Sequence, residues 1–198
     1  MSLTVYQSLK FMWANQMKRK LALLKPLLAI AVFVTLVITF YSLIGQDKTE
    51  LPSPLIDRPA PNFQVLDLLD KNIVHTQDEF MGRITMVNVW ASWCPTCYTE
   101  HPYWREYAKN TDLTLVGLNY RDKENAALGF LSKLGNPYQW NLFDNNGRLG
   151  IEFGVYGAPE TYLIDRKGKV RYRHVGMVSP DVYENIFLPL VEKIKKGF

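Results

Sequence analysis

Two cysteines stand three positions apart, where a buried strand is expected to turn into a helix. Residues 84–90 form a nearly continuous apolar run, which is typical of a central strand covered on both faces. Cys94 and Cys97 follow after a short turn, and Pro95 falls in the first helical turn, where proline is tolerated. The stretch therefore predicts an α/β domain with a dithiol at a strand-to-helix junction.

The start of a helix is a chemically active place for a cysteine. The first N–H groups of a helix have no intrahelical partner, and the macrodipole places partial positive charge there. Both effects favour a thiolate over a thiol, so Cys94 is predicted to be the nucleophile. Cys97 lies within one helical turn, where it can attack a mixed disulfide and release the substrate. The spacing thus indicates thiol–disulfide exchange.

Other uses of this cysteine pair fit the sequence less well. A structural disulfide over so short a loop removes little entropy from the unfolded chain. A zinc or copper site could use Cys94, Cys97 and His101, but the usual further ligands are missing. Haem attachment would need a histidine directly after Cys97, where Tyr98 stands. We therefore predict no metal, and we expect His101 to be a surface residue or to lie just behind the site.

Charge is distributed unevenly along the chain. The net charge is +4, and residues 1–46 contain five of the 23 basic residues and no acidic residue. The remaining residues, 47–198, carry 18 basic and 19 acidic residues, or a net charge of −1. The composition of this larger part therefore argues against a nucleic-acid-binding protein.

Residues 26–45 contain no charged side chain over 20 positions, the length that spans a bilayer as a helix. A cleaved signal peptide is the alternative, but its apolar region is shorter and ends in a small-x-small site that residues 42–45 match poorly. The five basic residues before the span have no acidic neighbour, whereas the residues directly after it, 47–50, carry a net charge of −1. The positive-inside rule then predicts cytoplasmic residues 1–25, an uncleaved anchor at residues 26–45, and the remaining chain outside the cytoplasm.

A proline-rich stretch follows the predicted anchor. Pro52, Pro54, Pro59 and Pro61 favour extended, polyproline-like chain. Residues 46–61 are therefore predicted to be a semi-rigid linker, and residues 62–198 to be the folded domain.

The domain alternates between strand and helix patterns. Strands are expected at residues 62–69, 73–76, 84–90, 113–120, 142–143, 160–165 and 170–175. Helical segments are expected at residues 78–81, 95–109, 123–134, 149–153 and 180–196, with a kink near Pro189. Strands separated by helices pair in parallel through right-handed crossovers, and a terminal hairpin adds antiparallel strands. A mixed central sheet flanked by helices is the predicted architecture.

Several motifs together carry a family resemblance. Residues 90–97, WASWCPTC, resemble the active site of the thioredoxin fold, and residues 154–161, GVYGAPET, resemble its cis-proline loop. Together with Glu100-His101, GNPY at residues 135–138 and YRH at residues 172–174, they closely resemble the DsbE (also CcmG) family. Members of that family are membrane-anchored thiol:disulfide interchange proteins of cytochrome c biogenesis. The similarity runs from about residue 59 to the last helix.

The resemblance implies a role for each active-site residue. Cys94 would be the exposed nucleophile and Cys97 the resolving cysteine. Pro159 would be cis and face the cysteines, while the backbone at Ala158 pairs with the substrate. The loop around the dithiol would further include Pro95, and two aromatic side chains would line its approach, those of Trp93 and Tyr156.

The resemblance also implies a role for two acidic residues. Thioredoxin carries a buried aspartate six residues before its first cysteine, and Asn88 occupies that position here. Proton handling must therefore differ. Glu100 and Glu160 match the acidic residues that are thought to take over in the family, and we predict that both tune the reactivity of the dithiol.

The function that follows is a periplasmic reductant on the bacterial inner membrane. It would reduce apocytochrome c or a partner that relays electrons to it, and a membrane donor of the DsbD or CcdA type would restore the dithiol. No cofactor is expected, because the redox centre is the cysteine pair. Two alternatives remain open: a thioredoxin-fold copper chaperone, whose cysteines are usually one residue further apart, and a general disulfide oxidant or isomerase.

Overall fold

The computed structural model describes residues 26, 28–42 and 53–197 of a chain that divides into two units, Met1–Thr49 and Glu50–Phe198. In the first unit, residues 28–42 form a helix whose side chains are all exposed. Among the described residues, no helix combines the length and the apolar character needed to cross a membrane. The predicted segment 1–25 and residues 43–45 of the predicted span lie outside the described residues, so the anchor stays a prediction.

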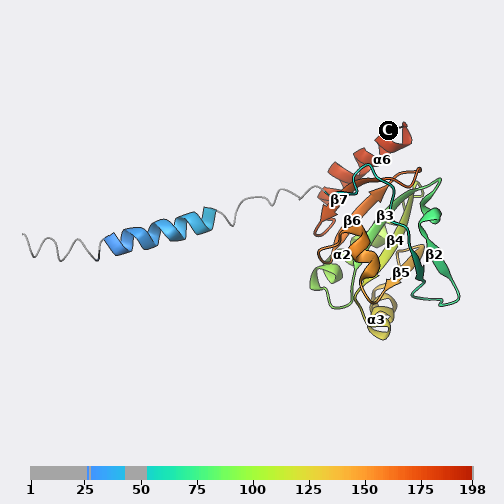
Figure 1. Ribbon diagram of the computed structural model, residues 1–198, viewed down its shortest axis with the longest axis horizontal. Coiled ribbons are helices and arrows are strands. Elements are labelled where there is room, and N and C mark those ends of the chain that lie inside the picture. Colours follow the sequence, from blue (N-terminus) through green and yellow to red (C-terminus); the bar gives the residue numbers. More distant parts are fainter. Residues whose placement is uncertain (1–25, 27, 43–52, 198) are drawn as a thin grey trace, which may run out of the picture. The chain divides into compact units, whose positions relative to one another are not determined.

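The second unit is built on a five-stranded mixed sheet in the order β5-β4-β3-β6-β7 (Figure 1). Strand β3 (Ile84–Trp90) pairs in parallel with β4 (Leu113–Tyr120), which pairs in parallel with β5 (Trp140–Asp144). On its other side, β3 pairs antiparallel with β6 (Glu160–Ile164), and β6 with β7 (Val170–Val175). The predicted thioredoxin-like architecture is confirmed.

Strand β3 lies at the centre of the sheet, and all seven of its residues are buried. Side chains alternate between the two faces of a strand. Met86 and Trp90 belong to the hydrophobic cluster on one face, and Val87 and Val89 belong to the cluster on the other. The continuous apolar run in the sequence is therefore explained by burial on both faces.

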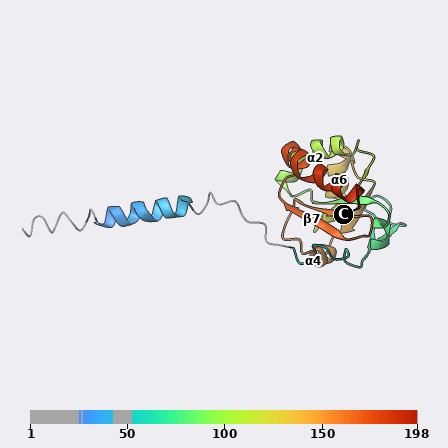
Figure 2. The same ribbon diagram turned by 90° about the horizontal axis from the view of Figure 1, so that it is seen from above.

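Helices cover the two faces unequally. The Met86 face receives α2 (Pro95–Tyr107), α3 (Glu124–Leu134) and the C-terminal α6 (Leu188–Lys195). The other face receives the short α4 (Arg148–Phe153). Figure 2 shows α2 and α6 on the side of the domain opposite to α4. Because β3 leads into α2, the cysteines lie at the carboxyl end of the central strand.

A small hairpin of β1 (Gln64–Leu66) and β2 (Val74–Thr76) precedes the main sheet and leads into one 3-10 turn, η1 (Gln77–Phe80). Strand β1 is shorter than the expected strand at residues 62–69. Its end is explained by Asp67, whose carboxylate accepts the N–H groups of Leu69 and Asp70 at 2.7 and 3.0 Å and so bends the chain.

The described part of the predicted linker, residues 53–61, is folded onto the domain. Asp57 N–H donates to the Val170 carbonyl at 2.8 Å, Val170 N–H donates to Arg58, and Ala60 N–H donates to Gly168. Residues 54–57 form turns, and Pro59 forms an isolated antiparallel β-bridge with Lys169. This part of the expected 46–61 spacer is therefore a segment docked at the start of β7.

The expected C-terminal helix at residues 180–196 is continuous but irregular. It comprises α5 (Pro180–Val182), a π-helical segment η2 (Tyr183–Phe187) and α6. Pro189 occupies the first turn of α6. Proline has no N–H for the helical ladder, and the preceding turn widens to a π-helix where that bond is missing. The kink predicted at Pro189 stays a prediction, and what the structure shows is the π-helical segment before it.

Candidate active site

Cys94 and Cys97 form a disulfide at the start of α2, with their Cα atoms 5.3 Å apart. Cys94 is the N-cap of the helix, and its Sγ accepts the N–H of Cys97 at 3.1 Å. A cap position turns a free backbone N–H toward the side chain. The same N–H, together with the positive end of the helix dipole, can stabilise a thiolate at Cys94 after reduction.

The exposure of the residues around the disulfide differs from one to the next. Cys94 is only 2% exposed, so the expectation of an exposed nucleophile is wrong for this oxidised form. The apolar disulfide packs within the cluster that includes Trp90, which explains its burial. Trp93 is 52% exposed and Pro95 is exposed, as the predicted approach to the dithiol requires.

Strand pairing brings Pro159 to the active-site end of the sheet. The Ala158–Pro159 peptide bond is cis, as predicted. In the antiparallel register, Val89 lies opposite Glu160, so Pro159 comes to the end of β3 from which the active-site turn departs. Ala158 is half-buried and packs against the cluster that holds both cysteines.

Glu160 is buried and fully engaged, in a group of residues that we call the Glu160 cluster: Tyr156, Gly157, Glu160, Tyr162 and Arg173. Its Oε1 accepts the N–H groups of Tyr156 and Gly157 at 2.8 and 3.2 Å. Its Oε2 accepts the Tyr162 hydroxyl at 3.0 Å and two N–H groups of Arg173 at 3.0 and 2.8 Å. The carboxylate thus ties the loop before Pro159 to β7.

Tyr156 belongs to the same cluster but is 73% exposed. The guanidinium of the buried Arg173 lies 4.7 Å from the centre of the Tyr156 ring, within the range of a cation–π contact. The ring is therefore supported from below by a charged group while its other face meets solvent. The exposure agrees with the predicted role of Tyr156 in lining the approach to the dithiol, and that role stays a prediction.

Glu100 is also buried, but its partners are neutral. Its Oε1 accepts the amide of Asn88 at 3.1 Å, and its Oε2 accepts the backbone N–H of Val178 at 3.1 Å. Burial raises the pKa of Glu100 to about 7, against the lowering effect of these hydrogen bonds. Glu100 lies three residues after Cys97 on α2, so both project from the same side of the helix.

Asn88 organises the groups around Glu100, which we call the Glu100 network: Asn88, Glu100, Tyr138, Thr161 and the N–H of Val178. The Asn88 amide also donates to the Thr161 hydroxyl at 3.3 Å, and its Oδ1 accepts the Tyr138 hydroxyl at 2.7 Å. Burial and the nearby Glu100 raise the pKa of Tyr138 well above its usual value. Asn88 lies on the α2 face of β3 and so reaches Glu100.

His101 lies behind the site. It is 1% exposed, its Nε2 lies 2.7 Å from the carbonyl oxygen of Gly135, and burial lowers its pKa. Of the two expectations for His101, a surface position is therefore wrong and a position behind the site is correct. Within the described residues, no group of three or more histidine, cysteine or acidic side chains is placed to hold a metal ion.

One group of site residues was missed in the sequence. Asp122 is 8% exposed and holds Ser92, two residues before Cys94, through the Ser92 N–H and hydroxyl at 2.5 and 2.7 Å. The available signal was an aspartate two residues after the end of a buried strand that pairs in parallel with the strand leading to the cysteines. Carboxyl ends of parallel strands meet at one edge of the sheet.

Comparison with known proteins agrees with this geometry. The Redoxin family model matches residues 56–186. Thiol:disulfide interchange protein DsbE of Vibrio cholerae is 47% identical over 150 residues, covering 76% of this chain and 81% of that protein. DsbE of Escherichia coli strain K12 is 41% identical over 182 residues, covering 91% and 98%. The crystal structure of a Chlorobium tepidum protein described as thiol:disulfide interchange protein DsbE matches with a TM-score of 0.60 at 27% identity. The match covers 73% of this chain and 99% of that protein.

A thioredoxin-like fold with a cysteine pair at the start of α2 defines a thiol–disulfide oxidoreductase. Its redox centre is the dithiol itself. With relatives of this identity along most of its length, the chain belongs to the DsbE family of thiol:disulfide interchange proteins.

Proposed function

We propose that this chain is a membrane-anchored periplasmic reductant that delivers electrons to apocytochrome c, or to a partner that relays them, during cytochrome c maturation. The proposal is supported by membership of the DsbE family and by the charge-free segment at residues 26–45, which is preceded by five basic residues and no acidic residue. A haem-binding motif needs free thiols, and an oxidising compartment removes them. A local reductant answers that need.

The reaction is a two-electron exchange between the Cys94–Cys97 dithiol and a substrate disulfide. The thiolate of Cys94 attacks one sulfur of the substrate disulfide, the substrate S–S bond breaks, and its other sulfur leaves as a thiolate that takes up a proton. Cys97 then loses its proton and attacks Cys94 Sγ in the mixed disulfide. The second substrate thiolate leaves, so the substrate is reduced by two electrons and the Cys94–Cys97 pair is oxidised.

Glu100 is the group that we assign to the proton of Cys97. Its side chain projects from the same side of α2, and its pKa of about 7 lets it both accept and return a proton near neutral pH. Asn88 and the Val178 N–H hold the carboxyl group in place without a charge that would fix its protonation state. The neutral network therefore supports the pKa-tuning role predicted for Glu100.

We assign substrate recognition to the loop before β6 and to two exposed aromatic side chains, those of Trp93 and Tyr156. An extended substrate segment would pair with the backbone at Ala158, beside the cis Pro159. Trp93 and Tyr156 expose large apolar surfaces on the approach to Cys94. Glu160 supports this binding surface by holding the N–H groups of Tyr156 and Gly157, and its predicted influence on the dithiol stays a prediction.

The observation that carries the assignment of roles is the Cys97 N–H that points at Cys94 Sγ from the first turn of α2. We expect Cys97→Ser to accumulate mixed disulfides with substrate, because Cys94 still attacks and nothing resolves the product. Cys94→Ser should accumulate none. Non-reducing electrophoresis after acid quenching measures both. Equal trapping by the two variants would contradict the assignment.

The partners follow from the chemistry of the cycle. Each turnover leaves a disulfide at Cys94–Cys97, so a donor must return two electrons, and a membrane protein of the DsbD or CcdA type is proposed for that step. An anchor at residues 26–45 would keep the domain near donor and acceptor and raise their effective concentration. Protease added to spheroplasts should digest residues 62–198 from outside, and protection there would contradict the location.

A further inference from the structure

Residues in the turn after β4 hydrogen-bond to the turn between β3 and α2, which leads to Cys94. The carboxylate of Asp122 accepts four hydrogen bonds and is the central group of this contact. Its Oδ2 accepts the N–H of Ser92 at 2.5 Å and the amide of Asn119 at 3.1 Å. Its Oδ1 accepts the Ser92 hydroxyl at 2.7 Å and the N–H of Lys123 at 2.8 Å. The carboxylate therefore ties the turn before α2 to the start of α3.

The same turn holds the indole of Trp93. Trp93 Nε1 donates to the backbone carbonyl of Arg121 at 3.0 Å, although the side chain is 52% exposed. An exposed side chain has little packing to restrict its rotamers. Its orientation beside Cys94 therefore depends on this bond and on the position of the neighbouring Ser92.

Arg121 itself is held firmly. It adopts a left-handed φ of 47°, its N–H donates to the Asp144 carbonyl at 2.9 Å, and its guanidinium lies 5.3 Å from the centre of the Tyr120 ring. Its side chain fills the space over Gly147, where a Cβ atom would collide with it. The carbonyl that accepts the Trp93 indole thus belongs to a rigid turn.

We propose that Asp122 is a positioning residue of the oxidoreductase: through Ser92, and together with the Arg121 carbonyl, it sets where Trp93 stands beside Cys94 and so determines how well polypeptide disulfides are recognised. The inference rests on the proposed function in one respect, which is that Cys94 is the attacking sulfur. A polypeptide substrate must pass the indole to reach Cys94. A small disulfide such as oxidised glutathione has little surface to place against it.

The test compares two substrates in two variants and one control. Asp122→Asn replaces an acceptor-only group by one whose NH₂ faces the Ser92 N–H. Ser92→Ala removes only the hydroxyl donor, and it keeps the test available if Asp122→Asn fails to fold. Asp165→Asn is the control, because Asp165 is 3% exposed and also accepts two backbone N–H groups, at 2.8 and 2.9 Å.

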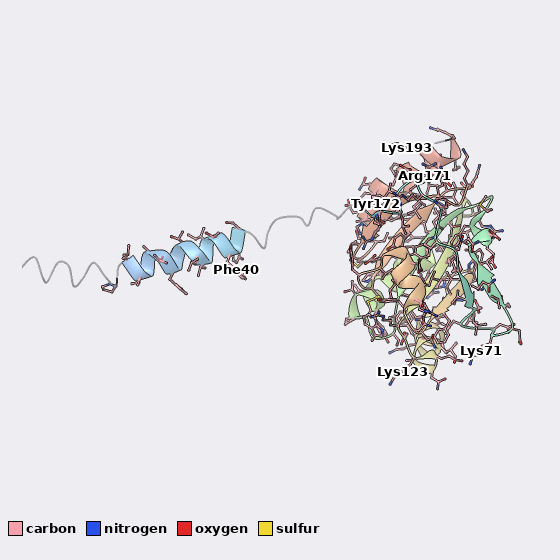
Figure 3. All side chains as sticks on the ribbon, viewed as in Figure 1. Phe40, Lys71, Lys123, Arg171, Tyr172 and Lys193 are labelled. Atoms are coloured by element: carbon pink, nitrogen blue, oxygen red, sulfur yellow. A yellow bond between two sulfur atoms is a disulfide. The ribbon has the colours of Figure 1, made fainter. Side chains whose placement is uncertain are left out.

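The control lies far from the dithiol. Asp165 follows β6 at the end where Ile164 pairs with Thr85, near the beginning of β3, whereas Cys94 follows the end of β3. In Figure 3, Arg171, which binds Asp165, and Lys123, which follows Asp122, lie at opposite ends of the domain. Asp165→Asn is therefore expected to lower stability without changing the active-site turn.

Stopped-flow measurements on the reduced full-length chain in detergent give the rate as a function of substrate concentration. The substrates are a disulfide-bonded peptide with the sequence Cys-Xaa-Xaa-Cys-His and oxidised glutathione. For Asp122→Asn we expect the half-saturating peptide concentration to rise about tenfold, and for Ser92→Ala less, because a small displacement of a positioning group has effects of this size. The rate with glutathione should stay within about twofold.

A spectroscopic readout tests the position of the indole directly. In the fluorotryptophan-labelled chain, the fluorine resonance of Trp93, assigned by its loss in Trp93→Phe, should move or broaden in Asp122→Asn and stay unchanged in Asp165→Asn.

Three results would overturn the inference. The first is an equal slowing with both substrates, which would place the effect on Cys94 chemistry; the second is no change with the peptide; the third is the same selective loss in Asp165→Asn. Trapping with Cys97→Ser separates this inference from the proposed function. If that variant traps the peptide while Asp122→Asn shows no selectivity, only the inference fails, whereas an absence of trapping refutes the assignment of Cys94 on which both rest.

Discussion

The Glu100 network and the Glu160 cluster each bury a glutamate beside the active-site end of β3, and they hold it in opposite ways. Glu100 accepts hydrogen bonds from an amide and a backbone N–H, both neutral. Glu160 accepts two bonds from Arg173, a permanent cation, in addition to its other donors. The pKa of Glu100 is about 7, whereas the Glu160 carboxylate is held in an ion pair with Arg173.

The two sites differ in what compensates the burial of the carboxyl group. Desolvation raises the pKa of Glu100, whose hydrogen-bond partners among the described residues carry no positive charge. At Glu160 the same burial is offset by an ion pair, and the carboxylate serves to shape the loop that precedes Pro159. The Glu100 network thus contains a carboxyl group with a pKa near neutral, and the Glu160 cluster contains an ion pair that holds the loop before Pro159.

The largest effect is expected from breaking the ion pair of the Glu160 cluster. Glu160→Ala leaves Arg173 buried without its carboxylate, and the free energy of unfolding should fall by about 3–5 kcal/mol in guanidinium titrations. Replacing both partners, in Glu160→Leu with Arg173→Met, should cost less than Glu160→Ala alone, because no buried charge remains. A double variant as unstable as the sum of its single variants would contradict the view of these residues as one unit.

The next effect concerns the pH dependence of stability at Glu100. Its pKa is about 7 in the folded chain against an ordinary value of 4.5, so the folded chain keeps a proton that the unfolded chain loses. The free energy of unfolding should therefore fall by about 3 kcal/mol from this group as the pH rises through that window, and then level off. Glu100→Gln should remove this part of the pH dependence, measured as the difference between the two titration curves.

The constant cost of the Glu100→Gln substitution does not disturb this readout. Any hydrogen bond lost to the new amide shifts the stability equally at all pH values. Equal pH dependence of the variant and the unaltered chain between pH 4.5 and 7 would show that Glu100 does not titrate in this window.

A smaller effect is expected within the Glu100 network at Tyr138. Tyr138→Phe removes the hydroxyl that donates to Asn88 Oδ1 at 2.7 Å and should lower the free energy of unfolding by about 1 kcal/mol. Thermal unfolding measures the change. Tyr103→Phe is the matched control, since Tyr103 lies half-buried against the same core. A similar loss of stability in that variant would show that the hydrogen bond to Asn88 is not the cause of the loss in Tyr138→Phe.

The smallest effect on stability is expected at the exposed end of the Glu160 cluster. Tyr156→Leu removes the ring above Arg173 and should cost about 0.5 kcal/mol in unfolding experiments. Its effect on reaction with a peptide disulfide should be larger than its effect on stability, and Tyr156→Phe should behave like the unaltered chain in both assays. A strong loss in Tyr156→Phe would instead assign the function to the hydroxyl group.

Local patterns in the sequence predict most of the fold. Strands β3, β4 and β7 begin and end at the predicted residues, because long apolar or alternating runs define a strand and both of its ends. The boundaries of β1 and β5 were missed, since Asp67 and the pairing of Asn141 with Gly117 set them through contacts distant in sequence. The docking of residues 53–60 on β7 was missed for the same reason.

The candidate site was predictable as a set of residues and much less so as a network. The cysteines, Pro159 and both glutamates come from motifs, but Arg173 joins Glu160 only because β6 and β7 pair. Asp122 meets Ser92 only because β3 and β4 run in parallel and end together. Sequence spacing shows which residues can react, and the sheet register decides which buried groups accompany them.

The central claim, that the dithiol acts as a reductant, is tested most directly by its reduction potential. The full-length chain in detergent would be equilibrated with mixtures of reduced and oxidised glutathione, and the Cys94–Cys97 disulfide quantified after acid quenching. The account predicts a potential at or below about −200 mV, on the side of thioredoxin at about −270 mV. A potential near about −120 mV, the value of a strong oxidant, would mean that the dithiol is the favoured state and would contradict the assignment as a reductant.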